Sequence, residues 1–294
     1  MKSSSINREP AVAGQFYPAS AEKLQRDVET YFSEAVPQKY TNVRALISPH
    51  AGYVFSGRVA ASAFNQLDEN ADYERIFILA SSHHYHFNGA SVYCHGDFIM
   101  PYGREKVDTD FGKQLVASHP EIFTDNPAPH AREHSIEVQL PFLHYKLKKD
   151  YKIVPIVIGT SQPETCFEIA SALKPYLSEK NLFVISTDFS HYPDYESAKI
   201  VDAATAKAIL SNNPENLLDV LAKNQNRGIP NLLTCLCGWT SVLTLLYMTY
   251  NNPIYEYREV DYRNSGDAIY GNYREVVGYW AIVLIQEKEY NEYE

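Results

Sequence analysis

Short, continuously apolar segments that alternate with helix-like segments are the feature that most restricts how this chain can fold. Four such segments lie at residues 44–48, 75–80, 152–158 and 181–186. Strands that are apolar at nearly every position are typical of a sheet covered by helices on both faces, and helical connections between them favour parallel pairing. The sequence therefore predicts a three-layer α/β/α fold around a mostly parallel central sheet.

The periodicity between and after these strands completes the predicted fold. Helical spacing of apolar side chains predicts helices over residues 20–35, 57–67 and 163–178. Ser20 stands at the start of the first, where its side chain can cap the helix. Two further strands are predicted in direct succession at residues 255–261 and 276–285, so the sheet should be mixed. A Tyr-Arg-Glu-Val repeat at 257–260 and 273–276 also predicts two similar strands.

Composition narrows the class of protein. The 294 residues carry 26 basic and 36 acidic side chains, and this net charge of −10 argues against nucleic acid or an anionic membrane surface as the main partner. The chain has no apolar run of the roughly 18 residues that a membrane span needs, and its N-terminus lacks the apolar core of a signal peptide. We therefore expect a cytoplasmic protein with a single domain over residues 1–294.

Polar residues come directly after three of the predicted strands. His50 follows the first strand, His83 follows the second, and Asp188 and His191 follow the fourth. Ligands of open α/β sheets bind beyond the carboxyl ends of the strands, so these side chains should meet at one edge of the sheet. A single histidine in such a place is more often structural. Three strands that end in the same way favour a functional site.

Two predicted helix starts add candidate residues to this edge. His134 lies at or near the start of one apolar helix, and Cys237 directly precedes another that begins at Trp239. The dipole and the free amides of a helix N-terminus stabilise a thiolate, which suits metal ligation. The alternative is a buried, inert thiol. Imidazoles nearby favour the metal-ligand interpretation.

Other chemistries lack their sequence signatures. The chain contains no Gly-x-Ser-x-Gly nucleophile motif, P-loop or Gly-x-Gly-x-x-Gly motif. Cys235 and Cys237 have no second cysteine pair at the spacing of a structural zinc site.

One motif resembles a zinc-peptidase site. His130, Glu133 and His134 match the inverted pattern His-x-x-Glu-His, which works only when one helix carries both histidines. Pro127 and Pro129 lie just upstream, and the residue before a proline is biased away from helix. We therefore expect the helix to begin after His134 and His130 to be exposed on the preceding loop. The motif should not be a peptidase site.

Taken in order, these motifs resemble those of the Memo family. The resemblance rests on residues 8–17, 49–53, 82–84, 133–137, 187–191 and 237–238. Memo proteins are similar in fold to the catalytic subunit of class III extradiol dioxygenases, which are non-haem iron enzymes. The resemblance implies that His50, His83 and Cys237 bind a transition metal, iron or copper in the first place and zinc as a further option. It also implies that Asp188 and His191 line the same pocket, with His134 opposite.

Two departures limit what this resemblance implies. Ser190 stands where the family often has a cysteine, so an activity that needs two thiols in the pocket is in doubt. Non-haem iron oxygenases use two histidines and one carboxylate, whereas the thiolate of Cys237 takes the place of that carboxylate. A thiolate is softer and favours copper(I), zinc or a thiolate-bound iron.

Two functions remain open from the sequence. In the first, the chain is a metal-dependent redox enzyme for a small molecule, such as an aromatic or phenolic one. His191 or His134 would be the acid or base, and Asp188 would be an orienting group or an alternate metal ligand. In the second, it is a non-catalytic adaptor that binds a peptide or protein partner in the same cleft, as the resemblance to eukaryotic Memo proteins implies. Microbial members are associated with a radical-SAM protein and an AMMECR1-like protein, which makes these two the implied partners.

Overall fold

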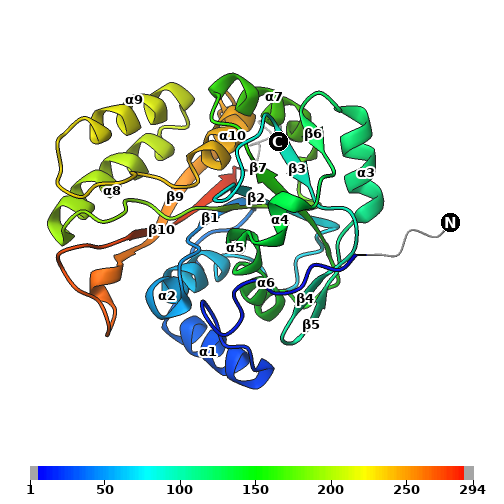
Figure 1. The fold of residues 1–294 in the computed structure, drawn as a ribbon, viewed down its shortest axis with the longest axis horizontal. Helices are drawn as coiled ribbons and strands as arrows, with labels where there is room; N and C mark the ends of the chain where they lie inside the picture. Colours follow the sequence, from blue (N-terminus) through cyan, green and yellow to red (C-terminus); the bar gives the residue numbers. More distant parts are fainter. Residues whose placement is uncertain (1–5, 288–294) are drawn as a thin grey trace, which may run out of the picture.

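An eight-stranded sheet between two layers of helices forms the centre of the molecule (Figure 1). The computed structural model describes residues 6–287. The strand order across the sheet is β6-β3-β7-β2-β8-β1-β10-β9. The strands are β1 (Val43–Ser48), β2 (Arg75–Ser81), β3 (Ala90–Val92), β6 (Phe123–Thr124), β7 (Lys152–Ile158), β8 (Asn181–Ser186), β9 (Tyr255–Asn264) and β10 (Gly278–Gln286). A separate hairpin pairs β4 (Phe98–Met100) with β5 (Gly103–Glu105).

The strand directions confirm a mixed sheet with a parallel centre. Strands β7, β2, β8 and β1 are parallel neighbours. The chain's last two strands add an antiparallel edge, since β10 pairs with β1 and β9 pairs with β10. At the other edge β3 runs antiparallel to β7, and β6 runs parallel to β3. The carboxyl ends of β3 and β6 therefore point in the opposite direction to the carboxyl ends of β1, β2 and β8. Below, the side of the sheet at which the carboxyl ends of β1, β2 and β8 lie is one edge, and the side at which those of β3 and β6 lie is the opposite edge.

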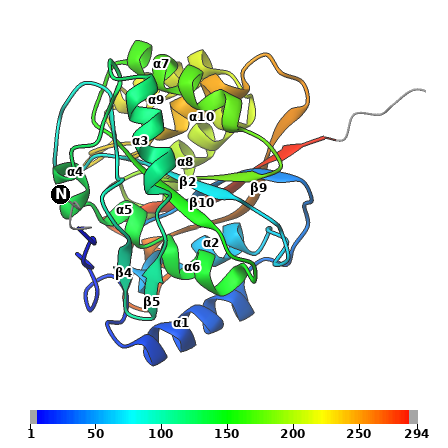
Figure 2. The ribbon, with the colours of Figure 1, turned by 90° about the vertical axis from the view of Figure 1, so that its right-hand side faces the viewer.

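Alternate residues of the central strands enter two separate apolar cores. In β2, Phe77 and Leu79 belong to the core on one face, whereas Ile76 and Ile78 belong to the core on the other. The first core packs against α3, α7, α8, α9 and α10, and the second packs against α1, α2 and α6. Figure 2 shows these two groups of helices above and below the sheet. The three-layer α/β/α prediction is confirmed.

The helices agree with the sequence pattern except at some of their ends. Ser20 caps α1 by accepting a hydrogen bond from the Lys23 amide, as predicted. The helix expected at 57–67 begins four residues earlier, at Tyr53. The α-helices are α1 (Ala21–Glu34), α2 (Tyr53–Phe64), α3 (Thr109–Ser118), α4 (Ala128–Ala131), α5 (His134–Glu137), α6 (Leu140–Lys146), α7 (Pro163–Leu173), α8 (Tyr195–Leu210), α9 (Pro214–Gln225) and α10 (Trp239–Thr249). Short 3-10 helices lie at Lys174–Tyr176 and Ser265–Asp267.

Two further points concern single segments. The second Tyr-Arg-Glu-Val copy, residues 273–276, is a bend before β10, so the prediction of a second similar strand there is wrong. Its first three side chains are exposed, so this copy lacks the packing that would hold a strand in the sheet. Among residues 6–287, no helix combines the length and apolar character that crossing a bilayer requires.

A buried ion pair fastens the N-terminal segment to the body of the protein. The Arg8 guanidinium contacts the Glu137 carboxylate at the end of α5, and both side chains are almost fully buried. The same carboxylate accepts hydrogen bonds from the Tyr17 hydroxyl (2.5 Å) and from the Ala11 and Val12 amides (2.8 and 3.1 Å). The Glu137 carboxylate therefore has hydrogen-bond donors for both of its oxygens in the folded state. The positive charge of Arg8 compensates the cost of burying its negative charge.

We expect Arg8→Ala to lower the free energy of unfolding by about 3–5 kcal/mol, because it leaves a buried carboxylate without its countercharge. Denaturant unfolding followed by circular dichroism measures this loss. Lys199→Ala breaks an exposed pair with Glu196 and should cost at most about 1 kcal/mol. An Arg8→Ala loss as small as that of Lys199→Ala would contradict a structural role for the buried pair.

Candidate functional site

Parallel register brings the ends of three strands together. Ser186 at the end of β8 is paired with Ser48 of β1 on one side and with Ala80 of β2 on the other. His50 and Asp188 each lie two residues beyond this aligned row, and His83 lies three residues beyond it. The predicted meeting of the strand ends at one edge of the sheet is therefore correct for these three side chains.

The hydrogen bonds of His50 determine which of its nitrogens is free. His50 is 2% exposed, and its Nδ1 lies 2.9 Å from Ser186 Oγ. That hydroxyl donates its own proton to the Ser135 carbonyl (2.7 Å) and accepts a hydrogen bond from Gln139 (2.9 Å). His50 Nδ1 must therefore carry a proton and donate it to Ser186. The lone pair of Nε2 then faces Cys237 Sγ, 3.2 Å away.

His83 is oriented by the carboxylate of Glu133. Its Nδ1 donates to Glu133 Oε1 and its amide donates to Oε2, each at 2.8 Å. Burial alone would lower the pKa of His83, but hydrogen bonds with Cys237 and Glu133 outweigh it and raise the pKa to about 10. Burial likewise opposes the ionisation of Glu133, yet the hydrogen bonds and charge of His83 hold its pKa well below the usual range.

Glu133 belongs to this group of side chains, although sequence reasoning did not assign it a role. It appeared only as part of a motif, and its contact with His83 joins positions fifty residues apart. Its side chain also accepts hydrogen bonds from the Ser135 amide and hydroxyl at the start of α5. Ser186 and Gln139, which orient His50, were missed for the same reason. An acidic residue next to a candidate histidine was the one signal available.

Cys237 is held against the end of β8 by a close backbone approach. Its Sγ accepts a hydrogen bond from the Asp188 amide at 3.2 Å, and Gly238 directly follows it as the N-cap of α10. A Cβ at Gly238 would lie 2.5 Å from Thr187 Cβ, so only glycine permits this contact. Burial raises the pKa of the Cys237 thiol, and its hydrogen bond with His83 acts in the opposite direction.

His134 joins the two other imidazoles at this edge. One ring nitrogen from each of His50, His83 and His134 lies within 4.8 Å of the others, which makes these three a group that could hold a metal ion. The His134 ring centroid is 4.8 Å from that of His83 and 5.3 Å from that of His50. Burial and the charge of His83 lower the pKa of His134 to about 4. Its ring is therefore a neutral neighbour of the other two.

Asp188 and His191 complete the set predicted from the strand ends. Asp188 is buried, accepts a hydrogen bond from the His50 amide (2.8 Å) and lies 3.9 Å from His50 Nε2. Burial raises its pKa, and the positive charge of a protonated His191 lowers it. His191 is half-buried, with Nδ1 3.0 Å from the Phe189 carbonyl. A carbonyl can only accept, so the Nε2 of a neutral His191 is a free proton acceptor.

The predicted exposure of His130 is wrong. His130 is 1% exposed and lies in the single helical turn α4, where its Nε2 is 3.0 Å from the Ser91 carbonyl. The prolines upstream begin this turn instead of preventing it. The chain leaves the helix before Glu133, and α5 starts anew at His134. His130 and His134 therefore lie on separate helices. A zinc-peptidase motif needs both histidines on one helix, so this arrangement agrees with the prediction that the motif is not a peptidase site.

The donor set fits a transition metal. The proton positions above leave the Nε2 atoms of His50 and His83 without protons in their neutral forms, and His50 Nε2 lies 3.2 Å from the Cys237 sulfur. Metal-ligating histidines characteristically donate their second ring N–H to a carboxylate or another oxygen, as His83 does to Glu133 and His50 does to Ser186. Two imidazoles and a thiolate suit iron, copper and zinc.

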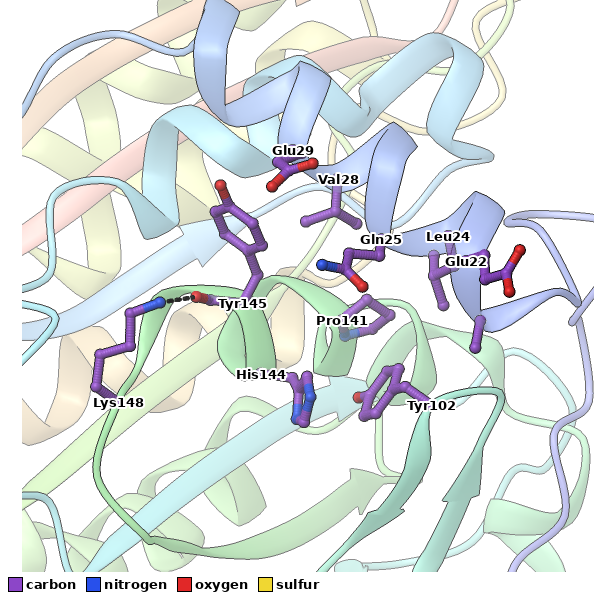
Figure 3. Close-up of a pocket in the computed structure, with 11 residues that line it drawn as sticks. Glu22, Leu24, Gln25, Val28, Glu29, Tyr102, Pro141, His144, Tyr145 and Lys148 are labelled. Atoms are coloured by element: carbon purple, nitrogen blue, oxygen red, sulfur yellow. Dashed lines mark hydrogen bonds between the residues drawn. The ribbon is translucent and has the colours of Figure 1, made fainter.

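A cavity of about 610 Å³ lies away from this group, between α1 and α6 (Figure 3). Tyr102 and His144 stack on one another on one side of it, and Gln25 and Glu29 of α1 line the other. None of the imidazoles at the strand ends contributes to its lining. The cavity is therefore separate from the candidate metal site.

Comparison with known proteins identifies relatives of nearly the same length. Residues 8–283 match the family described as Memo-like protein. A MEMO1 family protein of Methanosarcina mazei is 31% identical over 280 residues, which cover 94% of this chain and 98% of the relative. A MEMO1 family protein of Desulfurococcus amylolyticus is 33% identical, with coverage of 94% and 98%. An uncharacterized Escherichia coli K12 protein, JW3007, is a more remote structural neighbour, with a TM-score of 0.47 and 15% identity.

A buried carboxylate lies behind the loop that carries Asp188 and His191. Asp202 of α8 is fully buried, accepts hydrogen bonds from the Ser190 amide (2.9 Å) and the Tyr262 hydroxyl (2.8 Å), and has no basic partner among these contacts. Burial raises its pKa to about 7, although both hydrogen bonds act to lower it. The folded protein therefore binds this proton more tightly than the unfolded chain does.

The contribution of Asp202 to the free energy of unfolding should fall as the pH rises from about 4 to about 7, because the folded state must then give up the Asp202 proton. Asp202→Asn removes this titration, so the difference between the two proteins should change by up to roughly 4 kcal/mol across that range. Denaturant unfolding at several pH values measures it. Asp150→Asn, at an exposed position, is the matched control. Parallel curves for wild type and Asp202→Asn would contradict the raised pKa.

Proposed function

We propose, from the premise that the chain belongs to the Memo-like protein family, that it binds one transition metal ion through His50, His83 and Cys237. The observation that carries this proposal is the free Nε2 of His50, 3.2 Å from Cys237 Sγ and fixed by the proton that Nδ1 gives to Ser186. Since the hydrogen bonds that orient these ligands are already made, little reorganisation is needed on binding.

Iron and copper are the metals that we propose first, and zinc is the redox-inactive alternative. A bound iron or copper would supply one-electron chemistry and a binding position for a small oxidant or a phenolate oxygen. The surrounding residues have distinct tasks. Glu133 and Ser186 are positioning residues, because their hydrogen bonds fix the orientation of the two proposed ligand rings. Asp188 holds the backbone of His50 in place and lies within reach of the ligand ring.

The activity that fits this arrangement is metal-dependent oxidation of a small molecule such as a catechol. In a ring-opening dioxygenation both atoms of O₂ enter the product, so the reaction needs no external reductant. The protein must still take a proton from the phenolic hydroxyl. His191 is the proposed acceptor, because its Nδ1 is held by the Phe189 carbonyl and its Nε2 is free. His134, with its lowered pKa, is the second candidate base.

The cytoplasm is the proposed location. Cys94, Cys166, Cys235 and Cys237 are all free thiols, and three of them are buried. Free thiols persist in reducing compartments, where disulfides are rare.

We expect His50→Ala, His83→Ala and Cys237→Ala each to weaken binding of one equivalent of metal by about 100-fold or more, since even loss of a residue that merely orients a ligand costs 10–100-fold. Elemental analysis of protein purified without a histidine tag, followed by titration with iron(II) and copper(I), measures this. His119→Ala, a half-buried position away from the site, and Cys166→Ala, a buried thiol elsewhere, are the matched controls.

Glu133→Gln extends the same test to a positioning residue. The amide keeps the shape of the carboxylate but loses the charge opposite His83, so affinity should fall by about 10–100-fold with the fold intact. Unchanged metal content in all three ligand variants would exclude this metal site. Collapse of the fold in the metal-free protein would assign the ion a structural role.

We expect His191→Ala to lower turnover by about 10²–10⁴-fold while metal content stays near normal, because it removes a proton acceptor and no ligand. His50→Ala should abolish activity and metal binding together. Oxygen consumption with catechol-like substrates, started by admitting air to anaerobic metal-loaded protein, is the measurement. No oxygen consumption with any metal, together with tight binding of a peptide or protein at this site, would favour the adaptor function.

A further inference from the structure

A second group of potential metal ligands lies at the opposite edge of the sheet from the site described above. Strands β3 and β6 are parallel to each other, with Ala90 opposite Phe123 and Ser91 opposite Thr124. Because β3 runs antiparallel to β7, the ends of this pair point away from the edge that carries His50 and His83. Parallel pairing of β3 with β6 thus brings the residues that follow these two strands together at the opposite edge.

The residues that follow β3 and β6 have the side chains of a metal site. Cys94 and His95 come shortly after β3 ends at Val92, and Asp125 comes directly after β6 ends at Thr124. One ligand atom from each of Cys94, His95 and Asp125 lies within 4.8 Å of the others. Bonds of about 2.0–2.3 Å to an ion place tetrahedral ligand atoms roughly 3.5 Å apart, so a small side-chain rotation would close the group around one.

The hydrogen bond of His95 leaves a suitable nitrogen free. Its Nε2 lies 2.5 Å from the Asp125 carbonyl oxygen, which can only accept. Nε2 must therefore carry the proton, and Nδ1 keeps a lone pair in the neutral ring. This contact also fixes His95 to the same loop that provides the Asp125 carboxylate. A backbone carbonyl in this role is a common partner of metal-ligating histidines.

Burial changes across the group from the core to the surface. Cys94 is fully buried, His95 is intermediate and Asp125 is exposed. Helix α3 packs on the buried end so closely that a Cβ at Gly112 would lie 2.8 Å from Cys94 Cβ. The thiol is thereby held in one place, and the carboxylate remains accessible to an ion from solvent.

We propose that Cys94, His95 and Asp125 form a second metal site, suited to zinc. Sulfur, nitrogen and oxygen donors together suit Zn²⁺, which accepts all three in a tetrahedral arrangement. The ligands would be Cys94 Sγ, His95 Nδ1 and an Asp125 carboxylate oxygen, with water in the fourth position. This site shares no residue with the proposed iron or copper site, so the two proposals can be tested independently.

The test is zinc titration of the full chain in a Cys237→Ala background that also carries His50→Ala and His83→Ala, which removes the proposed ligands of the first site and two of its three imidazoles. We expect one remaining equivalent of zinc, and we expect Asp125→Asn to weaken it by about 10-fold or more, as loss of a ligand should cost at least what loss of a supporting contact does. Asp150→Asn is the matched control for an exposed aspartate. Cobalt(II) in the same background should show a thiolate-to-metal charge-transfer band that Cys94→Ala removes and Cys166→Ala keeps.

The outcomes separate this proposal from the first site. A zinc equivalent that Asp125→Asn and Cys94→Ala both weaken supports the second site even where Cys237→Ala has no effect on metal content. Absence of any equivalent in that combined background overturns the proposal, and so does an equivalent whose affinity Asp125→Asn leaves unchanged. Because Asp125 is exposed, Asp125→Asn should fold normally, and it tests the proposed site even if Cys94→Ala fails to fold.

Discussion

The in-register parallel pairing of β1, β8 and β2 is the constraint on which the candidate metal site depends. Ser48, Ser186 and Ala80 form one row across the sheet, and each strand leaves that row into a loop that carries a polar side chain. A shift of one residue would turn alternate side chains to the other face and separate His50 from His83. The apolar side chains of β2 enter both cores, so burial on two faces opposes any such shift. Packing of the core therefore fixes the geometry of the site.

A second level of constraint joins the N-terminal segment to the same site. Besides the ion pair with Glu137, the Arg8 guanidinium donates to the Glu133 carbonyl (2.7 Å) and to the His130 carbonyl (3.1 Å). The side chain of Glu133 in turn holds His83. The position of the His83 ring, a proposed metal ligand, is thus linked to Arg8 through one buried backbone segment. The cost of burying these charges is offset only because each has several hydrogen-bonding partners.

The sequence was sufficient for the sheet and for the residues at its edge, because both depend on local pattern. Continuous apolar runs predict buried parallel strands, and polar residues after them lie at the edge whatever the details of packing. The burial of His130 was not predictable in this way, since this residue of α4 bonds to the Ser91 carbonyl on strand β3, which is distant in the sequence. The role of Glu133 escaped for the same reason. Hydrogen bonds between distant segments depend on how loops fold over the sheet, and periodicity carries no information about that.

The reversal of direction at β3 separates the two proposed metal sites. Were β3 and β6 parallel to β7, their ends would add Cys94, His95 and Asp125 to the edge that already carries His50, His83 and Cys237. Two thiols and several imidazoles at one edge would compete for the same ion, and the softer ligands would dominate the choice of metal. The antiparallel β3–β7 pairing prevents this. It leaves one edge with the imidazoles of His50, His83 and His134 and the thiol of Cys237, and it gives the other edge a mixed set with an exposed carboxylate. Strand direction, more than residue type, thus determines which donors can act together in this fold.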